Sequence, residues 1–124
     1  MKMVFIEESE LYKYKKELVE SRVAFKRNDD TIYLAAYVDD VMIGFVGYKI
    51  LPDSIRLKTD YVLPEHREKG YYDKMFKERL DIIRKKFGNV RMTAYCTPMS
   101  VGTYARHGFS KKTQRNGITF VVYE

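Results

Sequence analysis

Residues 62–72 read VLPEHREKGYY, and they mark the point where the spacing of apolar side chains changes. Upstream, over 55–63, every second residue is apolar in most cases and the residues between them are mostly polar. This alternation is typical of a strand with one buried face. Downstream, over 71–87, apolar side chains recur at helical spacing, and a glycine follows as a natural stop. The stretch therefore joins a strand to a helix through a polar loop.

This loop has the features of an anion site. Unpaired backbone N–H groups and the positive end of the helix dipole converge where a strand leads into a helix start. Gly70 allows a ligand to approach the backbone closely, and Arg67, Lys69 and Lys74 add positive charge. The alternative is an ordinary connection with solvated charges, and this segment alone does not decide between the two.

The length and composition indicate one folded domain. A chain of 124 residues has room for a single hydrophobic core, so we assign one domain to 1–124. Its hydrophobic content of 45% is too high for a disordered chain. We find neither a membrane-spanning stretch nor the apolar stretch of a signal peptide, so we expect a cytoplasmic protein that does not interact with membranes. The single cysteine, Cys96, and two histidines favour neither a disulfide nor a metal site.

The net charge of +6 favours an anionic partner. Nucleic acid, phosphate groups and acidic proteins all fit this charge, and so does a basic surface that serves solubility alone. Charge therefore does not choose among these partners.

The rest of the chain predicts one mixed sheet. A helical pattern begins at Ser9 and continues to Phe25, and a second, shorter helix is expected over 100–107. Strands are expected over 31–38, 41–51, 55–63, 90–96 and 118–123, with 109–112 a further segment that could pair with the last. Because strands stand before and after a central helix, the fold class is α/β, a mostly antiparallel mixed α+β sheet flanked by helices.

A second motif lies after the predicted strand at 90–96 and makes the loop far more informative. The first motif contains Val62, Pro64, Arg67 and Gly70, and the second, of the form Y-x-x-x-G-F, contains Tyr104, Gly108 and Phe109. The two motifs, in this order and with one helix and one strand between them, resemble the GNAT superfamily of acyl-CoA-dependent N-acyltransferases.

The sequence departs from the GNAT pattern at three positions. Tyr72 stands where the family has Gly or Ala, and it either crowds a pyrophosphate or points into the core. Glu68 brings a negative charge to an anion site, which is unfavourable unless the side chain points outward. Thr97 stands where the family often has Asn.

The resemblance implies an N-acyltransferase that uses acetyl-CoA or another acyl-CoA and an amine-bearing acceptor, either a small molecule or a protein. It also implies that backbone amides of the loop bind the pyrophosphate and that the end of the preceding strand binds the pantetheine and polarises the thioester carbonyl. The expected cofactor-binding residues are Tyr61, Val62, Leu63, Arg67, Glu68, Lys69, Gly70, Tyr71 and Thr97.

Tyr104 matches the family tyrosine that often protonates the departing thiolate. A phenol can donate a proton while it stays neutral near pH 7, which suits this role. The alternative is a core aromatic residue at the start of a Gly-Phe turn.

Asp60 is the first candidate for a general base, because it lies on the strand leading into the site. Regular alternation places it on the face opposite Leu57, Thr59 and Tyr61. The competing interpretation is an ion pair with Arg56 or Lys58, which would lower the pKa of Asp60 and weaken it as a base. An enzyme that uses water in place of a dedicated base is a third reading.

Three other side chains are weaker candidates. His66 and His107 titrate near neutrality, although each fits a loop or capping residue better than a catalyst. Cys96 ends a strand near the expected thioester, where it is either a small buried hydrophobe or an acylated nucleophile.

The alternative function is a catalytically silent GNAT-like module that binds nucleotide or nucleic acid through its basic surface. Tyr72 and Glu68 favour this alternative, whereas Tyr104 with the following Gly-Phe favours the enzyme. No motif identifies the acceptor, and we also expect a homodimer paired through the C-terminal strand.

Overall fold

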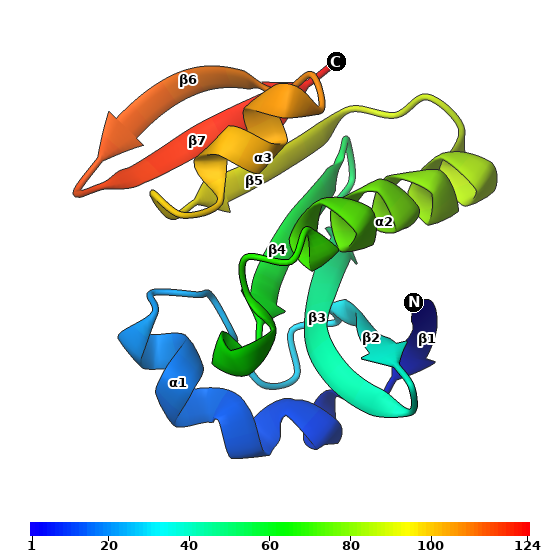
Figure 1. Cartoon of the computed structure of the whole chain (residues 1–124). Coiled ribbons are helices and arrows are strands. Elements are labelled where there is room, and N and C mark those ends of the chain that lie inside the picture. Colours follow the sequence, from blue (N-terminus) through cyan, green and yellow to red (C-terminus); the bar gives the residue numbers. More distant parts are fainter.

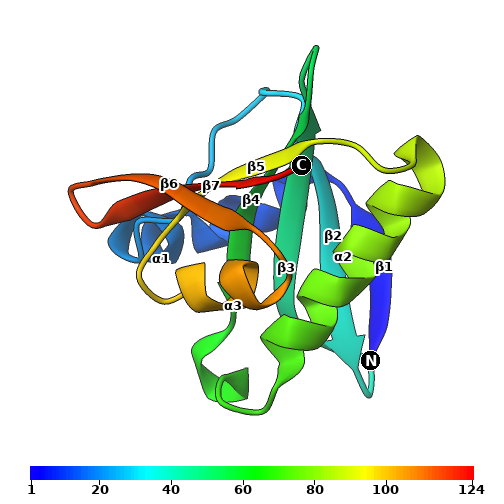
Figure 2. The ribbon, with the colours of Figure 1, turned by 90° about the horizontal axis from the view of Figure 1, so that it is seen from above.

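A computed structural model describes the whole chain, residues 1–124, as a mixed sheet of seven strands with helices on both faces (Figures 1 and 2). The strands are β1 Lys2–Ile6, β2 Ile32–Val38, β3 Val41–Ile50, β4 Ile55–Val62, β5 Met92–Cys96, β6 Ser110–Arg115 and β7 Ile118–Tyr123. The helices are α1 Lys15–Glu20, α2 Tyr71–Phe87 and α3 Val101–Arg106, with 3-10 helices at η1 Glu8–Tyr14 and η2 Pro64–His66. This architecture confirms the predicted fold class.

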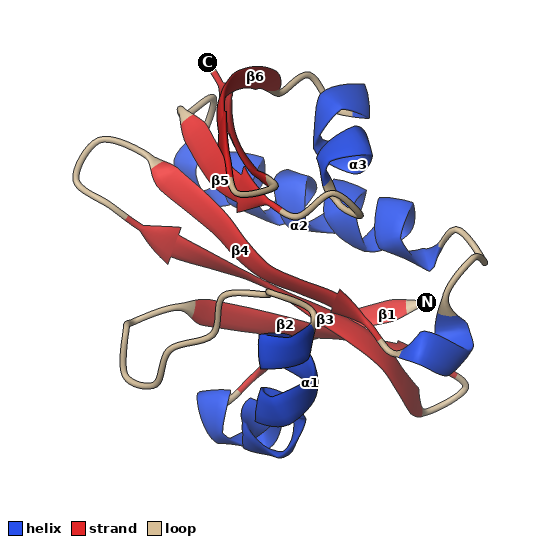
Figure 3. Cartoon of the chain, turned by 90° about the vertical axis from the view of Figure 1, so that its left-hand side faces the viewer, coloured by secondary structure: helices blue, strands red, loops and turns tan.

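The strand order β1-β2-β3-β4-β5-β7-β6 contains one parallel pair, β4 with β5. These two strands pair only over 55–57 and 92–94 and then separate, so β5 no longer covers the second half of β4 (Figure 3). The separation lies directly ahead of the loop that leads into α2. It therefore opens the sheet at the place where the sequence predicts the site.

Helices on opposite faces create two hydrophobic cores. The buried stripe of α2, which includes Phe76 and Ile83, packs with α3 against one face of the sheet. On the other face, Leu11 of η1 and Leu18 of α1 pack against Phe45 of β3. Burial of each such side chain typically contributes about 1.5–3 kcal/mol, so both faces anchor the sheet. None of the helices is long and apolar enough to cross a membrane.

An irregularity in β4 decides which face carries Asp60. Thr59 has a backbone φ of +59°, which is rare for a β-branched residue, and the pairing of β4 with β3 shifts here. As a result the side chains of Lys58 and Thr59 both bond to the segment that follows α1. Asp60 then lies with Leu57 on the α2 face, while Tyr61 packs on the opposite face. The prediction that Asp60 lies opposite Leu57 is wrong, because a bulge interrupts regular alternation.

The N-terminal region differs from its prediction in two ways. The helix expected from Ser9 to Phe25 is a 3-10 helix followed by a short α-helix that ends at Glu20. Phe25 lies beyond this helix and packs edge-on against Tyr12, with ring centroids 6.2 Å apart. Its position in the apolar pattern therefore reflects packing of a loop residue and not a continued helix. The strand β1 was not predicted, since a short edge strand with mostly uncovered side chains carries little alternation.

The C-terminal strand is an interior strand of the sheet. β7 lies between β5 and β6, and its backbone pairs with both of them. A homodimer formed by edge pairing of this strand, as we expected, does not fit this arrangement. The edge at this end of the sheet is β6, whose side chains are all exposed and include Lys111, Lys112 and Arg115. Charged side chains on an edge strand disfavour pairing with a second sheet.

Candidate active site

The start of α2 presents a row of unpaired backbone donors. Gly70 caps the helix with a left-handed φ of +79°, and the first helical bond runs from the Lys74 amide to the Gly70 carbonyl. The amides of residues 68–73 donate to no backbone carbonyl. A Cβ placed on Gly70 would meet no atom within 4 Å, so the backbone here is open to a ligand. These donors and the helix dipole together form an anion site.

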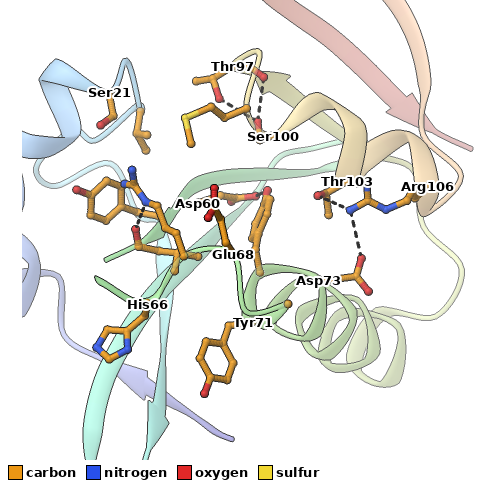
Figure 4. A pocket seen from close by; sticks show the side chains of 17 residues that line it. Ser21, Asp60, His66, Glu68, Tyr71, Asp73, Thr97, Ser100, Thr103 and Arg106 are labelled. Atoms are coloured by element: carbon orange, nitrogen blue, oxygen red, sulfur yellow. Dashed lines mark hydrogen bonds and ion pairs between the residues drawn. The ribbon is translucent and has the colours of Figure 1, made fainter. Parts of the chain in front are cut away.

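A cavity of about 340 Å³ lies between this loop, the open half of β4 and the segment ahead of α3 (Figure 4). All of the predicted cofactor-binding residues line it except Leu63 and Lys69. Asp60 and His66 line it as well, and Thr97 and Ser100 face it from the segment ahead of α3.

Arg67 does not extend toward the anion site as expected. Its Nε donates to the Val62 carbonyl at 2.8 Å, and its guanidinium lies 5.2 Å from the centroid of the Tyr61 ring. The side chain therefore folds back along the end of β4 and stabilises the loop, while the backbone amides supply most of the donors.

A hydrogen-bonded network centres on Asp60. Arg79 of α2 makes two contacts with its carboxylate, Nη1 to Oδ1 at 2.6 Å and Nη2 to Oδ2 at 2.9 Å. The hydroxyls of Tyr72 and Tyr104 both donate to Oδ2, at 2.5 and 2.8 Å. Arg79 is fully buried and also donates to the Gly47 carbonyl. The network thus connects β3, β4, α2 and α3 through one carboxylate.

The ion pairs predicted for Asp60 are absent from the structure. Lys58 lies 2.6 Å from Asp29 instead, and the guanidinium of Arg56 lies 5.0 Å from the centroid of the Tyr95 ring. Because β4 bulges ahead of Asp60, its carboxylate faces α2 and pairs with Arg79.

The network changes the acidity of its members. Burial raises the pKa of Tyr104 well above the ordinary value of 10, and the charge of Asp60 raises it further. Tyr72 has a similarly raised pKa for the same two reasons. Burial lowers the pKa of Arg79, but the negative charge of Asp60 outweighs this effect and raises it overall. Arg79 therefore carries a positive charge, and both tyrosines keep their protons at neutral pH.

A second cavity, of about 450 Å³, lies on the other side of this network. It is formed by the segment after α1, the first half of β4 and the end of β5. It shares Val23, Asp60, Thr97 and Ser100 with the first cavity, and Tyr104 lines it. The two cavities therefore meet next to the Asp60 carboxylate.

The weaker candidates from the sequence have ordinary structural surroundings. His107 stacks on Phe76, with ring centroids 4.7 Å apart, and its Nε2 lies 2.9 Å from Asp73 Oδ1. Cys96 is buried, and burial raises the pKa of its thiol to about 12, so the thiolate is scarce at neutral pH.

Comparison with known proteins decides the family. The family model for the acetyltransferase (GNAT) family matches residues 2–109. The chain belongs to the GNAT family. It is 32% identical over 114 residues to spermidine N(1)-acetyltransferase from Thermoplasma acidophilum, a match that spans 89% of this chain and 70% of that protein.

Solved structures share this fold. Escherichia coli ElaA superposes with a TM-score of 0.80 at 10% identity, with 100% of both chains covered. A GNAT family acetyltransferase from Elizabethkingia anophelis, solved with acetyl-CoA bound, has a TM-score of 0.73 at 14% identity, covering 99% of this chain and 97% of that one. The predicted family is thereby confirmed, and acetyl-CoA as the predicted cofactor agrees with what such GNAT structures hold.

The departures from the GNAT pattern are accommodated. Tyr72 points inward to Asp60, so its hydroxyl belongs to the buried network and lies away from the row of amides. Glu68 is exposed, with a left-handed φ of +62°. Neither side chain closes the first cavity.

Arg79 is the central residue that sequence reasoning missed. The signal was present, because Arg79 lies three positions after Phe76 and four before Ile83, inside the apolar stripe of the helix. A charged residue at such a position needs a buried partner of opposite charge. The stripe alone could not tell which carboxylate that partner is.

Proposed function

We propose that this chain transfers an acetyl group from acetyl-CoA to a primary amine. The observation that carries the proposal is the meeting of two cavities beside Asp60, one of which contains a row of free backbone amides at a helix start. The two cavities would let acetyl-CoA and the acceptor amine bind side by side, and direct acyl transfer requires that the two reactants be held together.

The residues of the first cavity fit acetyl-CoA. The amides of residues 68–73 would hold the pyrophosphate, and the open end of β4 would hold the pantetheine. When bound, acetyl-CoA supplies the acetyl group as a thioester, so that the acceptor nitrogen gains the acetyl carbon and loses a proton while the sulfur leaves and gains one. The space around Gly70 supports this assignment.

Tyr104 is the proposed source of the proton for the leaving sulfur. Its hydroxyl bonds to Asp60, which lines both cavities, and its raised pKa keeps the proton in place throughout the neutral range. The positive charge of Arg79 near the Tyr104 hydroxyl, with Nη2 at 3.4 Å, stabilises the negative charge that develops as the proton leaves.

Asp60 then acts as a positioning residue and not as the general base of the sequence hypothesis. Its two carboxylate oxygens already accept four hydrogen bonds, from Arg79, Tyr72 and Tyr104. To accept a proton from the amine, Asp60 would have to break this network. Its role is to hold the Tyr104 hydroxyl, which would turn from Asp60 Oδ2 toward the sulfur when it donates its proton.

Thermal unfolding with acetyl-CoA, CoA and ATP tests the proposal. A ligand at about 100 times its Kd raises the free energy of unfolding by about 2.7 kcal/mol, which increases Tm by several degrees. We expect this shift with acetyl-CoA and CoA and a much smaller one with ATP. Equal shifts with ATP, or none with the coenzymes, would contradict it. Mass spectrometry of amines incubated with protein and acetyl-CoA then tests transfer itself.

A further inference from the structure

The second cavity carries an excess of positive charge. Arg22, Arg56, Lys58 and Asp60 are its charged lining residues. The charge of Lys58 is matched by Asp29, and that of Asp60 is matched by Arg79. Neither Arg22 nor Arg56 has a carboxylate within ion-pair distance. The two arginines therefore make the cavity cationic.

Arg56 is held in place but lacks a hydrogen-bond partner. Its guanidinium lies over the ring of Tyr95, 5.0 Å from the centroid, which fixes the side chain beside the cavity. Its Nε is buried and has no hydrogen-bond partner in the protein. A buried donor without a partner costs free energy, so protein acceptors do not saturate the guanidinium of Arg56.

Arg22 is the second unpaired arginine that lines the cavity. It lies just after α1 and donates through Nη2 to the Asn116 carbonyl in the turn between β6 and β7, at 2.5 Å. This bond fixes the side chain and leaves its other guanidinium N–H groups free. Arg22 and Arg56 thus offer donors to one ligand from two elements that are far apart in the sequence.

We propose that the second cavity is the acceptor site and that it selects a primary amine carrying an anionic group, which Arg56 and Arg22 bind. The proposal rests on the proposed function, because it names the acceptor class of that same site. Guanidinium groups match the planar, two-oxygen geometry of carboxylates and also bind phosphates. With the anion at the arginines, the amine of a small molecule lies toward Asp60, Thr97 and Ser100, where the cavities meet.

The charge of the cavity argues against a polyamine as the acceptor. A polycation such as spermidine, on which the relative from Thermoplasma acidophilum is named to act, would bring positive charge next to two unpaired arginines. Like charges in a confined cavity repel, so this chain is expected to have a different acceptor preference.

The test compares acceptors that differ only in the anionic group. Protein and acetyl-CoA are incubated with a pool of standard L-amino acids, a pool of the corresponding amides, phosphoethanolamine, ethanolamine and spermidine, and the products are quantified by mass spectrometry. We expect kcat/KM to be at least about tenfold higher for one anionic class than for its uncharged counterpart and for spermidine, which corresponds to one strong charge-assisted contact. The amino-acid and phosphoethanolamine arms distinguish a carboxylate from a phosphate.

Variants connect the preference to the two arginines. Arg56→Gln and Arg22→Gln should each raise KM for the anionic amine by about tenfold or more and leave KM for its uncharged counterpart unchanged. Arg27→Gln is the matched control, because Arg27 also lies over a tyrosine ring, that of Tyr12 at 3.8 Å, but lines neither cavity. Since Arg22 is exposed, its variant tests the proposal even where Arg56→Gln fails to fold.

Two results would overturn the inference while the proposed function stands: faster acetylation of spermidine than of every anionic amine, or equal rates for both anionic classes and their uncharged counterparts. If no amine is acetylated, the proposed function fails, and a binding measurement decides the inference separately. In that measurement the Arg56 Nε–H resonance is followed by NMR as the amino-acid and amide pools are added to the CoA-loaded protein. A shift with the amino acids or with phosphoethanolamine, and none with the amides or ethanolamine, supports anion binding, and no difference overturns it.

Discussion

Arg79 on α2 and Asp60 on β4 form a buried two-contact ion pair, with Nη1–Oδ1 and Nη2–Oδ2 distances of 2.6 and 2.9 Å. The side chain of Arg79 is fully buried, and that of Asp60 is 8% exposed. The pair joins the helix that begins at the anion site to the strand that lines both cavities. Its geometry therefore determines the position of Tyr104 as well as the stability of the domain.

Removal of Arg79 should be strongly destabilising. Arg79→Leu leaves the Asp60 carboxylate buried without its counter-charge, and we expect a loss of about 3–5 kcal/mol in the free energy of unfolding. Urea denaturation measures this change. The matched control is Arg91→Gln, which breaks an exposed ion pair with Glu124 and should cost less than about 1 kcal/mol. Similar losses of unfolding free energy in the two variants would show that the buried pair stabilises the fold no more than the exposed pair does.

Tyr72 and Tyr104 both donate to Asp60, so a comparison of their variants distinguishes a proton donor from a residue that only holds the carboxylate in place. Tyr104→Phe and Tyr72→Phe each remove one hydroxyl that donates to Asp60 Oδ2, so each should lower the free energy of unfolding by a similar 1 kcal/mol or so. If Tyr104 supplies a proton to the leaving sulfur, Tyr104→Phe should lower kcat by about 100-fold, and Tyr72→Phe should lower it much less. Steady-state kinetics at saturating acetyl-CoA measures the difference, and equal losses of kcat would rule out a special role for Tyr104.

The raised pKa values of these tyrosines also predict how stability changes in alkali. Because the folded pKa of Tyr72 and of Tyr104 lies above the unfolded value of 10, the folded protein keeps protons that the unfolded chain releases. Their contribution is therefore complete below pH 10 and is lost as the pH rises from about 10 toward the folded values, by up to about 1.4 kcal/mol per pH unit for each group.

Urea denaturation between pH 8 and pH 11.5 tests this decline. The double variant Tyr72→Phe/Tyr104→Phe lacks both groups, so its free energy of unfolding should fall less steeply above pH 10 than that of the wild type. The other tyrosines are retained in both proteins, so the difference in slope belongs to this pair. Parallel curves would contradict the raised pKa values.

The elements that carry strong periodicity were predictable from sequence, and the site that depends on one bulge was not. The helix over 71–87 and the loop before it have the predicted bounds and the expected open amides. In contrast, nothing in the sequence signals the bulge at Thr59, because a β-branched residue disfavours the left-handed conformation that it adopts. The pattern therefore assigned Asp60 to the wrong face and to the wrong ion-pair partners.

A pair of glycines tests whether the start of α2 binds the coenzyme. Gly70 and Gly88 flank the same helix, both have a left-handed φ near the same value, +79° and +75°, and a Cβ on either would meet no atom within 4 Å. Gly70→Ala should cost about 1–2 kcal/mol of backbone strain, and Gly88→Ala should cost more, because the ψ of −154° at Gly88 lies in a region that is essentially restricted to glycine; urea denaturation measures both losses. Only Gly70 lines the first cavity, so only Gly70→Ala places a methyl group where the backbone is expected to contact pyrophosphate.

Isothermal titration with acetyl-CoA distinguishes the two variants. We expect Gly70→Ala to weaken binding at least about tenfold, because the methyl group separates the ligand from the row of amides, and a lost charge-assisted contact has an effect of this size. Gly88→Ala should bind as tightly as the wild type, since its glycine lies at the far end of the 17-residue helix. Equal affinities for Gly70→Ala and Gly88→Ala would place the phosphate groups away from this helix start and would leave the amides of residues 68–73 without an assigned ligand.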